Sequence, residues 1–230
     1  TKLAFSEKTV RAAFVRKVFF LVGCMLSIVV AECCLLMFVP GSDDFVNSTP
    51  GYILLGVFSV LFFVLYFVII CVKPLRHRFP INVLLAFVMA GSLGYLVATI
   101  CTYYTVDSVL LAVCLTLVST VSIGIFSCQT KFDMTNCIGV IILLCMYLFW
   151  ISFMSFFYMF YWYDPYWYNL MYSVIACTIF MLYLAIDIQL IMGGHRMSIS
   201  PEEYIFASVQ LFIDIVYIFI YLLQIFGIGK

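Results

Sequence analysis

Seven runs of about twenty mostly apolar residues follow one another along this chain, and no other feature constrains its fold as strongly. A helix that crosses the hydrocarbon core of a bilayer needs about 20 such residues. The runs show no strict alternation of apolar and polar residues, which disfavours a membrane β-barrel. The predicted spans are Val18–Val39, Gly51–Val72, Ile81–Tyr103, Ser108–Cys128, Cys137–Phe160, Tyr168–Met192 and Tyr204–Phe226. We therefore predict an all-α integral membrane protein in which residues 18–230 form a single seven-helix domain, preceded by a basic, amphipathic lead-in over residues 1–17.

The composition excludes the soluble classes of protein. Hydrophobic residues make up 67% of the chain and charged residues 10%, whereas about a quarter of a soluble domain is charged. A soluble enzyme, a disordered chain and a nucleic-acid binder with a basic patch are therefore all disfavoured. The sequence also lacks Gly-x-Ser-x-Gly, His-Glu-x-x-His and P-loop patterns, and its two histidines, His77 and His195, fall in predicted loops. We expect neither an enzyme nor a bound cofactor.

The basic residues are distributed on one side of the predicted membrane. Ten of the eleven Lys and Arg residues precede the first span or lie in the second, fourth and sixth loops. The positive-inside rule places this side, and with it the N-terminus, in the cytosol. The C-terminus then lies on the outer side, unless the last run re-enters the membrane instead of crossing it. Asn47, in the first outer loop, begins the sequon Asn-Ser-Thr and is a candidate glycosylation site. The chain begins with Thr1 rather than Met, which leaves room for a native segment before it.

The last run has a marked beginning and a polar face. Ser200, Pro201 and Glu203 match a capping box with proline in the first turn. The polar residues that follow recur at steps of 4, 3, 4 and 3 and so share one helix face; they are Gln210, Asp214, Tyr217, Tyr221 and Gln224. Lipid cannot satisfy such a face. The last helix is therefore predicted to be central, either packed among the others or lining a wet cavity, with these residues on the pore face.

Three ionisable side chains fall inside the spans, at Glu32, Asp187 and Asp214. Each costs at least ~2.5 kcal/mol near the membrane centre, so each needs a role. One role is structural, as a neutral, hydrogen-bonded acid that holds two helices together. The other is chemical. Asp187 and Asp214 flank the same predicted cytosolic loop and can meet if the last helix begins outside the hydrocarbon.

Two adjacent carboxylates in a low dielectric cannot both be charged cheaply. They would share a proton at low pH, and at higher pH they would repel each other or attract a cation. Carboxylate oxygens are the ligands that Ca²⁺ prefers. Such a pair therefore predicts a pH-gated cation path, with Asp187 and Asp214 as pH sensor and candidate calcium ligands, and with Ca²⁺ as the permeant ion.

The third span carries a ridge of small residues at four-residue spacing, at Ala86, Ala90, Gly94 and Ala98. Small side chains let helix backbones approach closely in lipid, where packing replaces the hydrophobic drive for helix association. We expect a neighbouring helix to pack along this ridge.

Several segments together resemble the transmembrane Bax-inhibitor-motif family, in its lifeguard branch. They are Phe5–Arg11, Phe14–Val18, Arg76–Asn82, Phe126–Lys131, Ser200–Ile205, Asp214–Ile215 and Leu222–Gly227. The resemblance implies a seven-helix fold with the last helix central. It also implies a proton-sensitive calcium leak from endoplasmic reticulum, Golgi or related membranes, or from the plasma membrane, and suppression of cell death.

The resemblance also assigns residues. The family's paired aspartates fall on Asp187 and Asp214, and a basic residue that locks the closed state falls on Lys73, Arg76 or Arg78. Three positions depart from the family pattern, namely Met25, Glu32 and Ile186. These departures concern the tuning of the gate.

Two other functions fit the same sequence. A non-conducting scaffold would bind death-pathway or channel proteins through the segments Lys2–Lys17 and His195–Glu203, with the aspartates as structural groups. A proton-coupled carrier would use the aspartates to drive solute uptake. The expected partners are the lipid bilayer, Ca²⁺, protons and death-pathway membrane proteins, and no nucleic acid.

Overall fold

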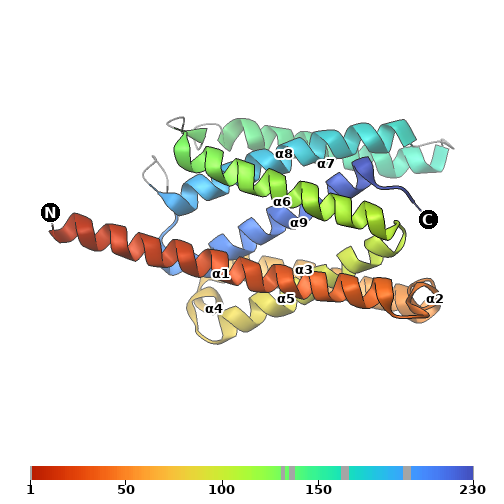
Figure 1. Ribbon diagram of the computed structural model, residues 1–230, viewed down its shortest axis with the longest axis horizontal. Helices are drawn as coiled ribbons and strands as arrows, with labels where there is room; N and C mark the ends of the chain where they lie inside the picture. The colour runs from red at the N-terminus through yellow and green to blue at the C-terminus, as the bar shows by residue number, and fades with distance from the viewer. Residues whose placement is uncertain (1, 131–132, 135–137, 162–165, 194–197, 230) are drawn as a thin grey trace. The chain divides into compact units, whose positions relative to one another are not determined.

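The computed structural model describes residues 2–130, 133–134, 138–161, 166–193 and 198–229 (Figure 1). The helices are α1 (Lys2–Phe38), α2 (Ser42–Val46), α3 (Thr49–Cys71), α4 (Lys73–His77), α5 (Ile81–Thr102), α6 (Val106–Gln129), α7 (Ile138–Tyr161), α8 (Tyr166–Met192) and α9 (Tyr204–Phe226), with a turn of 3₁₀ helix, η2 (Pro201–Glu203), directly before α9. Some residues used in the sequence predictions lie outside the described ones, namely Lys131, Cys137, His195, Arg196 and Lys230.

Six of these helices are long and apolar enough to cross a membrane. They contain Thr9–Phe38, Thr49–Cys71, Ile81–Thr102, Val106–Gln129, Trp167–Met192 and Pro201–Phe226. A seventh helix, α7, has 24 residues and includes the apolar stretch Ile142–Ile151. The seven long helices match the seven predicted spans and confirm the all-α membrane fold. The lead-in and the first span, which the sequence separates at Val18, form one continuous helix of 37 residues.

The chain divides into two compact units, and the first consists of Thr1–Asp107, Ile199–Phe212 and Ile228–Lys230. Within it, α5 packs against both α1 and α3. The predicted small-residue ridge of α5 is buried along its whole length. A Cβ added to Gly94 would lie 3.3 Å from the Cα of Val29 on α1, so the two backbones approach as closely as glycine allows. The prediction that a helix packs on this ridge is confirmed.

The second unit consists of Ser108–Ser198 and Ile213–Gly227. Here α7 packs against α8. Leu148 of α7 forms a buried cluster with Ala176 and Ile179 of α8, and Tyr221 of α9 packs against the same cluster. Among the six candidate spans, the one that contains α9 is the most buried, with 67% of an 18-residue window buried. The burial of α9 agrees with the central position predicted for the last helix.

The beginning of α9 is capped much as the sequence predicts. The Ser200 hydroxyl accepts a hydrogen bond from the Glu202 amide at 3.4 Å, and Pro201 occupies the first turn. The Glu203 carboxylate does not complete a capping box, however, because it pairs with Arg76 instead. The predicted start of the helix is therefore right, but the predicted role of Glu203 is wrong.

Two sets of contacts in the first unit bear on whether α9 crosses the membrane or re-enters it. Next to its beginning, Glu203 and Tyr204 contact Arg76 and Asn82, just before and within the first turn of α5. After its end, the Ile228 carbonyl accepts a hydrogen bond from the Thr105 amide at 3.1 Å, just beyond the last residue of α5. The chain segments that flank α9 thus contact opposite ends of α5. This arrangement favours a full crossing over re-entry.

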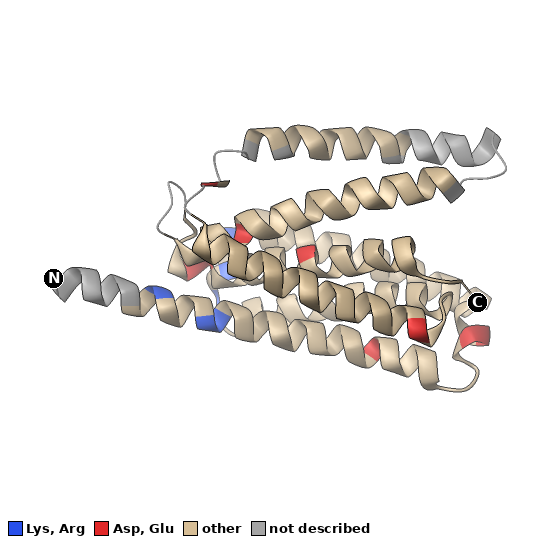
Figure 2. Ribbon diagram, turned by 45° about the horizontal axis from the view of Figure 1, so that its top comes forward, with Lys and Arg blue, Asp and Glu red and all other residues tan. Residues whose placement is uncertain are grey.

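The described basic residues all belong to the first unit, on α1, on α4 and directly after α4. Figure 2 shows basic residues in blue on the half of α1 that begins the chain. The one-sided distribution of Lys and Arg that the sequence predicts is therefore present among the described residues.

Candidate functional site

Asp187 of α8 and Asp214 of α9 face each other within the second unit. Their carboxyl groups are close enough to interact through a side-chain hydrogen bond and through their charges. Asp214 is only 6% exposed, and its Oδ2 atom is buried without a hydrogen-bond partner among the described residues. Asp187 is half-buried. The structure thus brings together two acids that lie on consecutive long helices, in a largely apolar surrounding.

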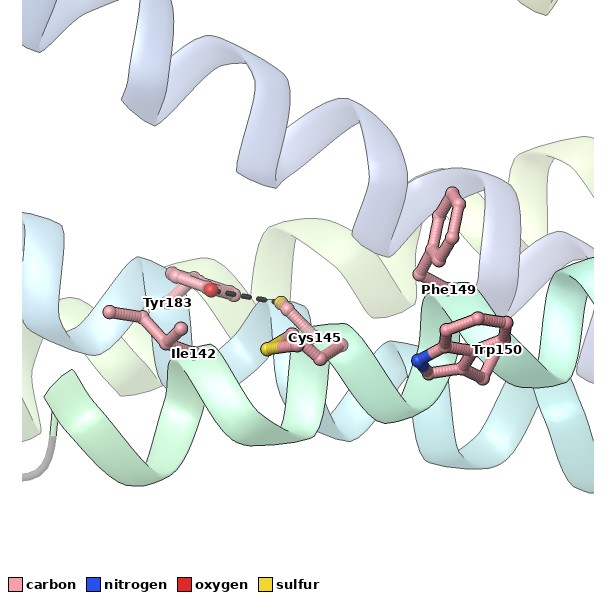
Figure 3. A pocket seen from close by; sticks show the side chains of 6 residues that line it. Ile142, Cys145, Phe149, Trp150 and Tyr183 are labelled. Carbon is pink, nitrogen blue, oxygen red and sulfur yellow. Dashed lines mark hydrogen bonds between the residues drawn. The ribbon is translucent and has the colours of Figure 1, made fainter.

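Tyr183 links this pair to the neighbouring helix. It lies one turn before Asp187 on α8, close enough to both carboxyl groups to experience their charges. Its hydroxyl lies 2.8 Å from the Sγ of Cys145 on α7. Both residues line an apolar groove of about 390 Å³ together with Ile142, Met146, Phe149 and Trp150 (Figure 3). Tyr183 is therefore both a neighbour of the carboxyl pair and part of the lining of this groove.

Aromatic rings occupy the α8–α9 interface beyond the pair. Phe180 of α8 stacks on Tyr217 with the ring centroids 4.8 Å apart and on Tyr221 with the centroids 5.8 Å apart. Further along, the Ser173 hydroxyl donates a hydrogen bond of 2.8 Å to Gln224. Three members of the predicted polar stripe thus contact α8, two through ring stacking and one through a hydrogen bond. Whether this face lines a wet cavity stays a prediction.

Gln210, the first member of the stripe, belongs to the first unit. Its side-chain oxygen accepts a hydrogen bond of 3.3 Å from the Tyr66 hydroxyl of α3. Gln210 is therefore satisfied by a contact between helices, whereas Oδ2 of Asp214, further along the same stripe, has no hydrogen-bond partner among the described residues.

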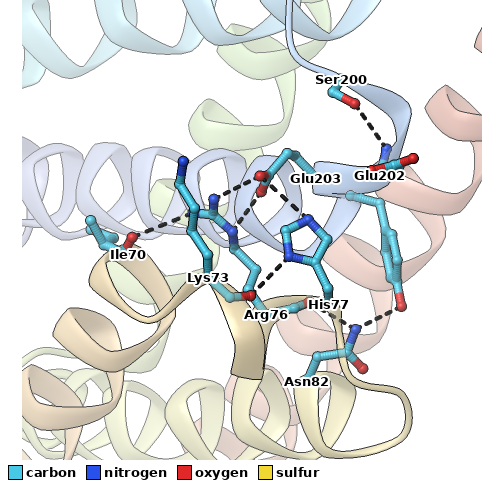
Figure 4. Close-up of polar contacts among 9 residues, drawn as sticks. Ile70, Lys73, Arg76, His77, Asn82, Ser200, Glu202 and Glu203 are labelled. Atoms are coloured by element: carbon cyan, nitrogen blue, oxygen red, sulfur yellow. Dashed lines mark hydrogen bonds and ion pairs between the residues drawn. The ribbon is translucent and has the colours of Figure 1, made fainter.

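Among the three basic candidates, only Arg76 is buried, at 7% exposure. Lys73 and Arg78 are exposed. The Arg76 Nε lies 2.5 Å from Oε2 of Glu203, and its Nη2 donates a hydrogen bond of 2.7 Å to Oε1 (Figure 4). The resemblance assigned a lock on the closed state to one of these three residues. The described contacts of Arg76 give it an acidic partner, Glu203, at the beginning of α9.

A network of polar contacts surrounds this ion pair (Figure 4). The His77 Nε2 lies 3.4 Å from Glu203, and its Nδ1 lies 2.8 Å from the Lys73 carbonyl. The Asn82 amide donates hydrogen bonds to the Arg76 carbonyl at 3.0 Å and to the Tyr204 hydroxyl at 2.9 Å. The beginning of α9 is thus held from α4 and α5 at once.

α1 holds the same region from another direction. The Lys17 ammonium lies 3.3 Å from the centre of the Tyr204 ring, a cation–π contact. The Arg11 guanidinium donates a hydrogen bond of 2.6 Å to the Ile199 carbonyl, just before the cap. Sequence reasoning missed the roles of Glu203, Asn82 and Lys17. The sequence did contain a signal for the ion pair. Two adjacent acids, Glu202 and Glu203, begin the last helix, and the loop after the second span is basic.

The two remaining predicted residues lie in the first unit. Glu32 of α1 lies against Gly91 and Gly94 of α5, and its Oε2 is buried without a hydrogen-bond partner among the described residues. Asn47 is exposed directly after α2, where its amide nitrogen donates to the Asp43 carbonyl at 2.8 Å. Attachment of a glycan to Asn47 remains a prediction and would require this hydrogen bond to open.

The described residues contain no group of three or more His, Cys, Asp and Glu side chains that could hold a metal ion. Ca²⁺ takes six to eight oxygen ligands, and two carboxylates supply at most about four of them. Asp187 and Asp214 by themselves therefore do not supply a complete ligand set for Ca²⁺.

Known proteins are similar to this chain over most of its length. A sequence model of the family described as inhibitor of apoptosis-promoting Bax1 matches residues 11–230. Human Protein lifeguard 3 is 33% identical over 223 residues, which cover 96% of this chain and 70% of the relative. Mouse Protein lifeguard 3 is 32% identical, over 96% of this chain and 71% of the relative. Mouse Protein lifeguard 4 is 27% identical, over 94% of this chain and 84% of the relative. The chain is therefore a multi-pass membrane protein that belongs to the Bax-inhibitor family.

Proposed function

We propose that this protein is a pH-sensitive calcium leak channel of intracellular membranes that regulates calcium stores and suppresses apoptosis. The observation that carries the proposal is the proximity of the carboxyl groups of Asp187 and Asp214, which lie close enough to interact through their charges. The N-terminus would be cytosolic, in endoplasmic reticulum, Golgi or related membranes, or in the plasma membrane. The chain belongs to the family described as inhibitor of apoptosis-promoting Bax1, and this membership supports the proposed role in apoptosis.

The pH dependence follows from the charge of the pair. With one proton shared, the two acids hydrogen-bond to each other and hold α8 against α9. When both are ionised they repel each other in a low dielectric, and the repulsion favours separation of the helices or the entry of a cation. The leak should therefore be small at low pH and rise as the pH rises.

The ion pair between Arg76 and Glu203 supports a second restraint on α9, in addition to the hydrogen-bonded aspartates. Asp214 lies on α9, and the beginning of α9 is held by Arg76 of α4. In the proposed mechanism, a movement of α9 as a whole that separates the aspartates would also strain this ion pair. In the proposed mechanism Arg76 thus locks the closed state through Glu203, without touching either aspartate.

The test is calcium flux in liposomes that contain the purified full chain and an enclosed calcium-sensitive dye. Parent protein should leak more at high pH than at low pH. Asp214→Asn removes one charge, and with it the repulsion, so its flux should no longer change with pH. Asp107→Asn is the matched control, because it makes the same change at an exposed acid at the start of α6. Equal flux from the parent and Asp214→Asn at every pH would refute the proposal.

One observation favours a second function as a scaffold. The two segments that could form a binding surface lie against each other, because Arg11 bonds to Ile199 and Lys17 contacts Tyr204. The combined surface would bind death-pathway membrane proteins without any conduction. Deletion of the first ten residues should weaken capture of such a protein in a pull-down, and unchanged capture would count against this surface.

A further inference from the structure

We propose that Cys33 and Cys101 form a reversible disulfide that links α1 to α5. Their Sγ atoms lie 3.9 Å apart, and both residues are free cysteines in the structure. Cys101 is completely buried, whereas Cys33 is half-buried and offers the accessible sulfur. The proposal rests on this contact and does not depend on whether the protein conducts calcium.

The contact follows from how the two helices pack in the first unit. Each helix buries a stripe at the same spacing of 4, 4 and 3 residues, which is the spacing of one helix face. The stripes are Met25, Val29, Cys33 and Leu36 on α1, and Ala90, Gly94, Ala98 and Cys101 on α5. Leu36 and Ala98 share a buried cluster, and Cys33 packs directly against it. The two thiols are therefore held together by the same close packing that Gly94 makes possible.

Both cysteines lie in the last two turns of their helices, which end at Phe38 and Thr102. A disulfide bond requires the sulfur atoms to approach to about 2.05 Å. The remaining movement of about 2 Å is shared between two side chains on helices that already touch. If the N-terminus is cytosolic, this end of the helices faces the outer or lumenal side, where disulfides persist.

The reaction needs an oxidant, and a lipid-soluble disulfide fits the position of Cys33. The Cys33 thiolate attacks one sulfur of this disulfide, which releases one thiol and leaves a mixed disulfide on Cys33. The Cys101 thiolate then attacks the Cys33 sulfur, forms the link and releases the second thiol. Two cysteine thiols lose two electrons and two protons, and the oxidant is reduced to two thiols.

The experiment uses the full chain in lipid nanodiscs, reduced and then exposed to dithiodipyridine, a membrane-permeant aromatic disulfide. Remaining thiols are alkylated with N-ethylmaleimide, and the digested protein is analysed by mass spectrometry. A Cys34→Ser background keeps the assignment clear, since Cys34 is adjacent to Cys33 but exposed. The expected product is a linked peptide pair, lighter by two hydrogen atoms than its two reduced parts, which separates again on reduction.

Cys33→Ser and Cys101→Ser should each abolish this linked pair, and restoring Cys34 should leave it unchanged. Recovery of both cysteines as alkylated thiols at every oxidant concentration would overturn the proposal. So would a stable mixed disulfide on Cys33 beside an alkylated Cys101. If a serine variant does not fold, the parent and Cys34→Ser measurements still decide, because they need neither substitution.

Discussion

Replacing Glu203 by Gln tests how the beginning of α9 is held. The change keeps the shape of the side chain but leaves the Arg76 guanidinium, 7% exposed, without its ionic partner. Two unit charges about 4 Å apart attract by about 4 kcal/mol at an effective dielectric constant of about 20, and removing one partner of a buried pair costs about 3–5 kcal/mol. The Phe206 ring, with its centroid 5.1 Å from the guanidinium carbon, still stabilises the cation. We therefore expect Glu203→Gln to lower the free energy of unfolding by about 3 kcal/mol.

Replacing the other partner, Arg76, should lower the free energy of unfolding by less, because the two partners differ in exposure. Arg76→Met leaves Glu203 unpaired, but that side chain is 20% exposed and water can reach it. We expect a loss of about 1.5 kcal/mol. The variant with both Arg76→Met and Glu203→Gln should lose less stability than the sum of the two single losses, because neither charge then remains unpaired. This non-additivity is the signature of a direct interaction.

The measurement is equilibrium unfolding in mixed micelles of rising SDS content, followed by far-UV circular dichroism. Glu202→Gln is the control, because this exposed neighbour loses the same charge and should change the stability by less than about 0.5 kcal/mol. A Glu203→Gln protein within that same margin of the parent would show that the ion pair does not hold α9.

Two further predictions concern packing. Gly94→Ala should destabilise the protein by about 1–3 kcal/mol, because its Cβ would overlap the Glu32 carboxyl group of α1 and lie 3.3 Å from the Cα of Val29. Gly56→Ala, whose Cβ would meet nothing within 4 Å, should not destabilise it. Equal thermal stability of the two variants would contradict the close approach of α1 and α5. Phe180→Ala should cost about 3 kcal/mol by removing the stack on α9, whereas Phe149→Ala, at a 65% exposed position, should cost far less. The same micelle unfolding assay compares the stability of these two variants. A larger loss for Phe149→Ala than for Phe180→Ala would show that the Phe180 ring does not stabilise the α8–α9 interface.

Much of the architecture could be predicted from the sequence, because hydropathy is a local property. A run of about 20 apolar residues has few alternatives to a membrane helix, whatever surrounds it. The same holds for faces of single helices. The ridge containing Gly94 and the stripe containing Asp214 follow from helix periodicity alone, and the structure places both at contacts between helices.

Which helix faces meet could be predicted only where a short connection along the chain keeps two helices adjacent. Asp187 and Asp214 lie on consecutive helices joined by a short connection, so their meeting was open to sequence reasoning. The length of the connection did not determine whether the two residues lie at the same depth in the membrane. Their contact was therefore predicted only on the condition that the last helix begins outside the hydrocarbon.

The lock at Glu203 and the thiol contact at Cys33 were decided by tertiary structure. Arg76 lies 127 positions before Glu203, and Cys33 lies 68 positions before Cys101. The sequence offered three basic residues of equal chemical merit near the end of the second span. Only Arg76 points into the protein, because the short helix α4 turns its neighbours outward. The sequence determines which helix faces must be buried, since that depends on each segment alone; which faces meet depends on how all the helices pack together, and no single segment carries that information.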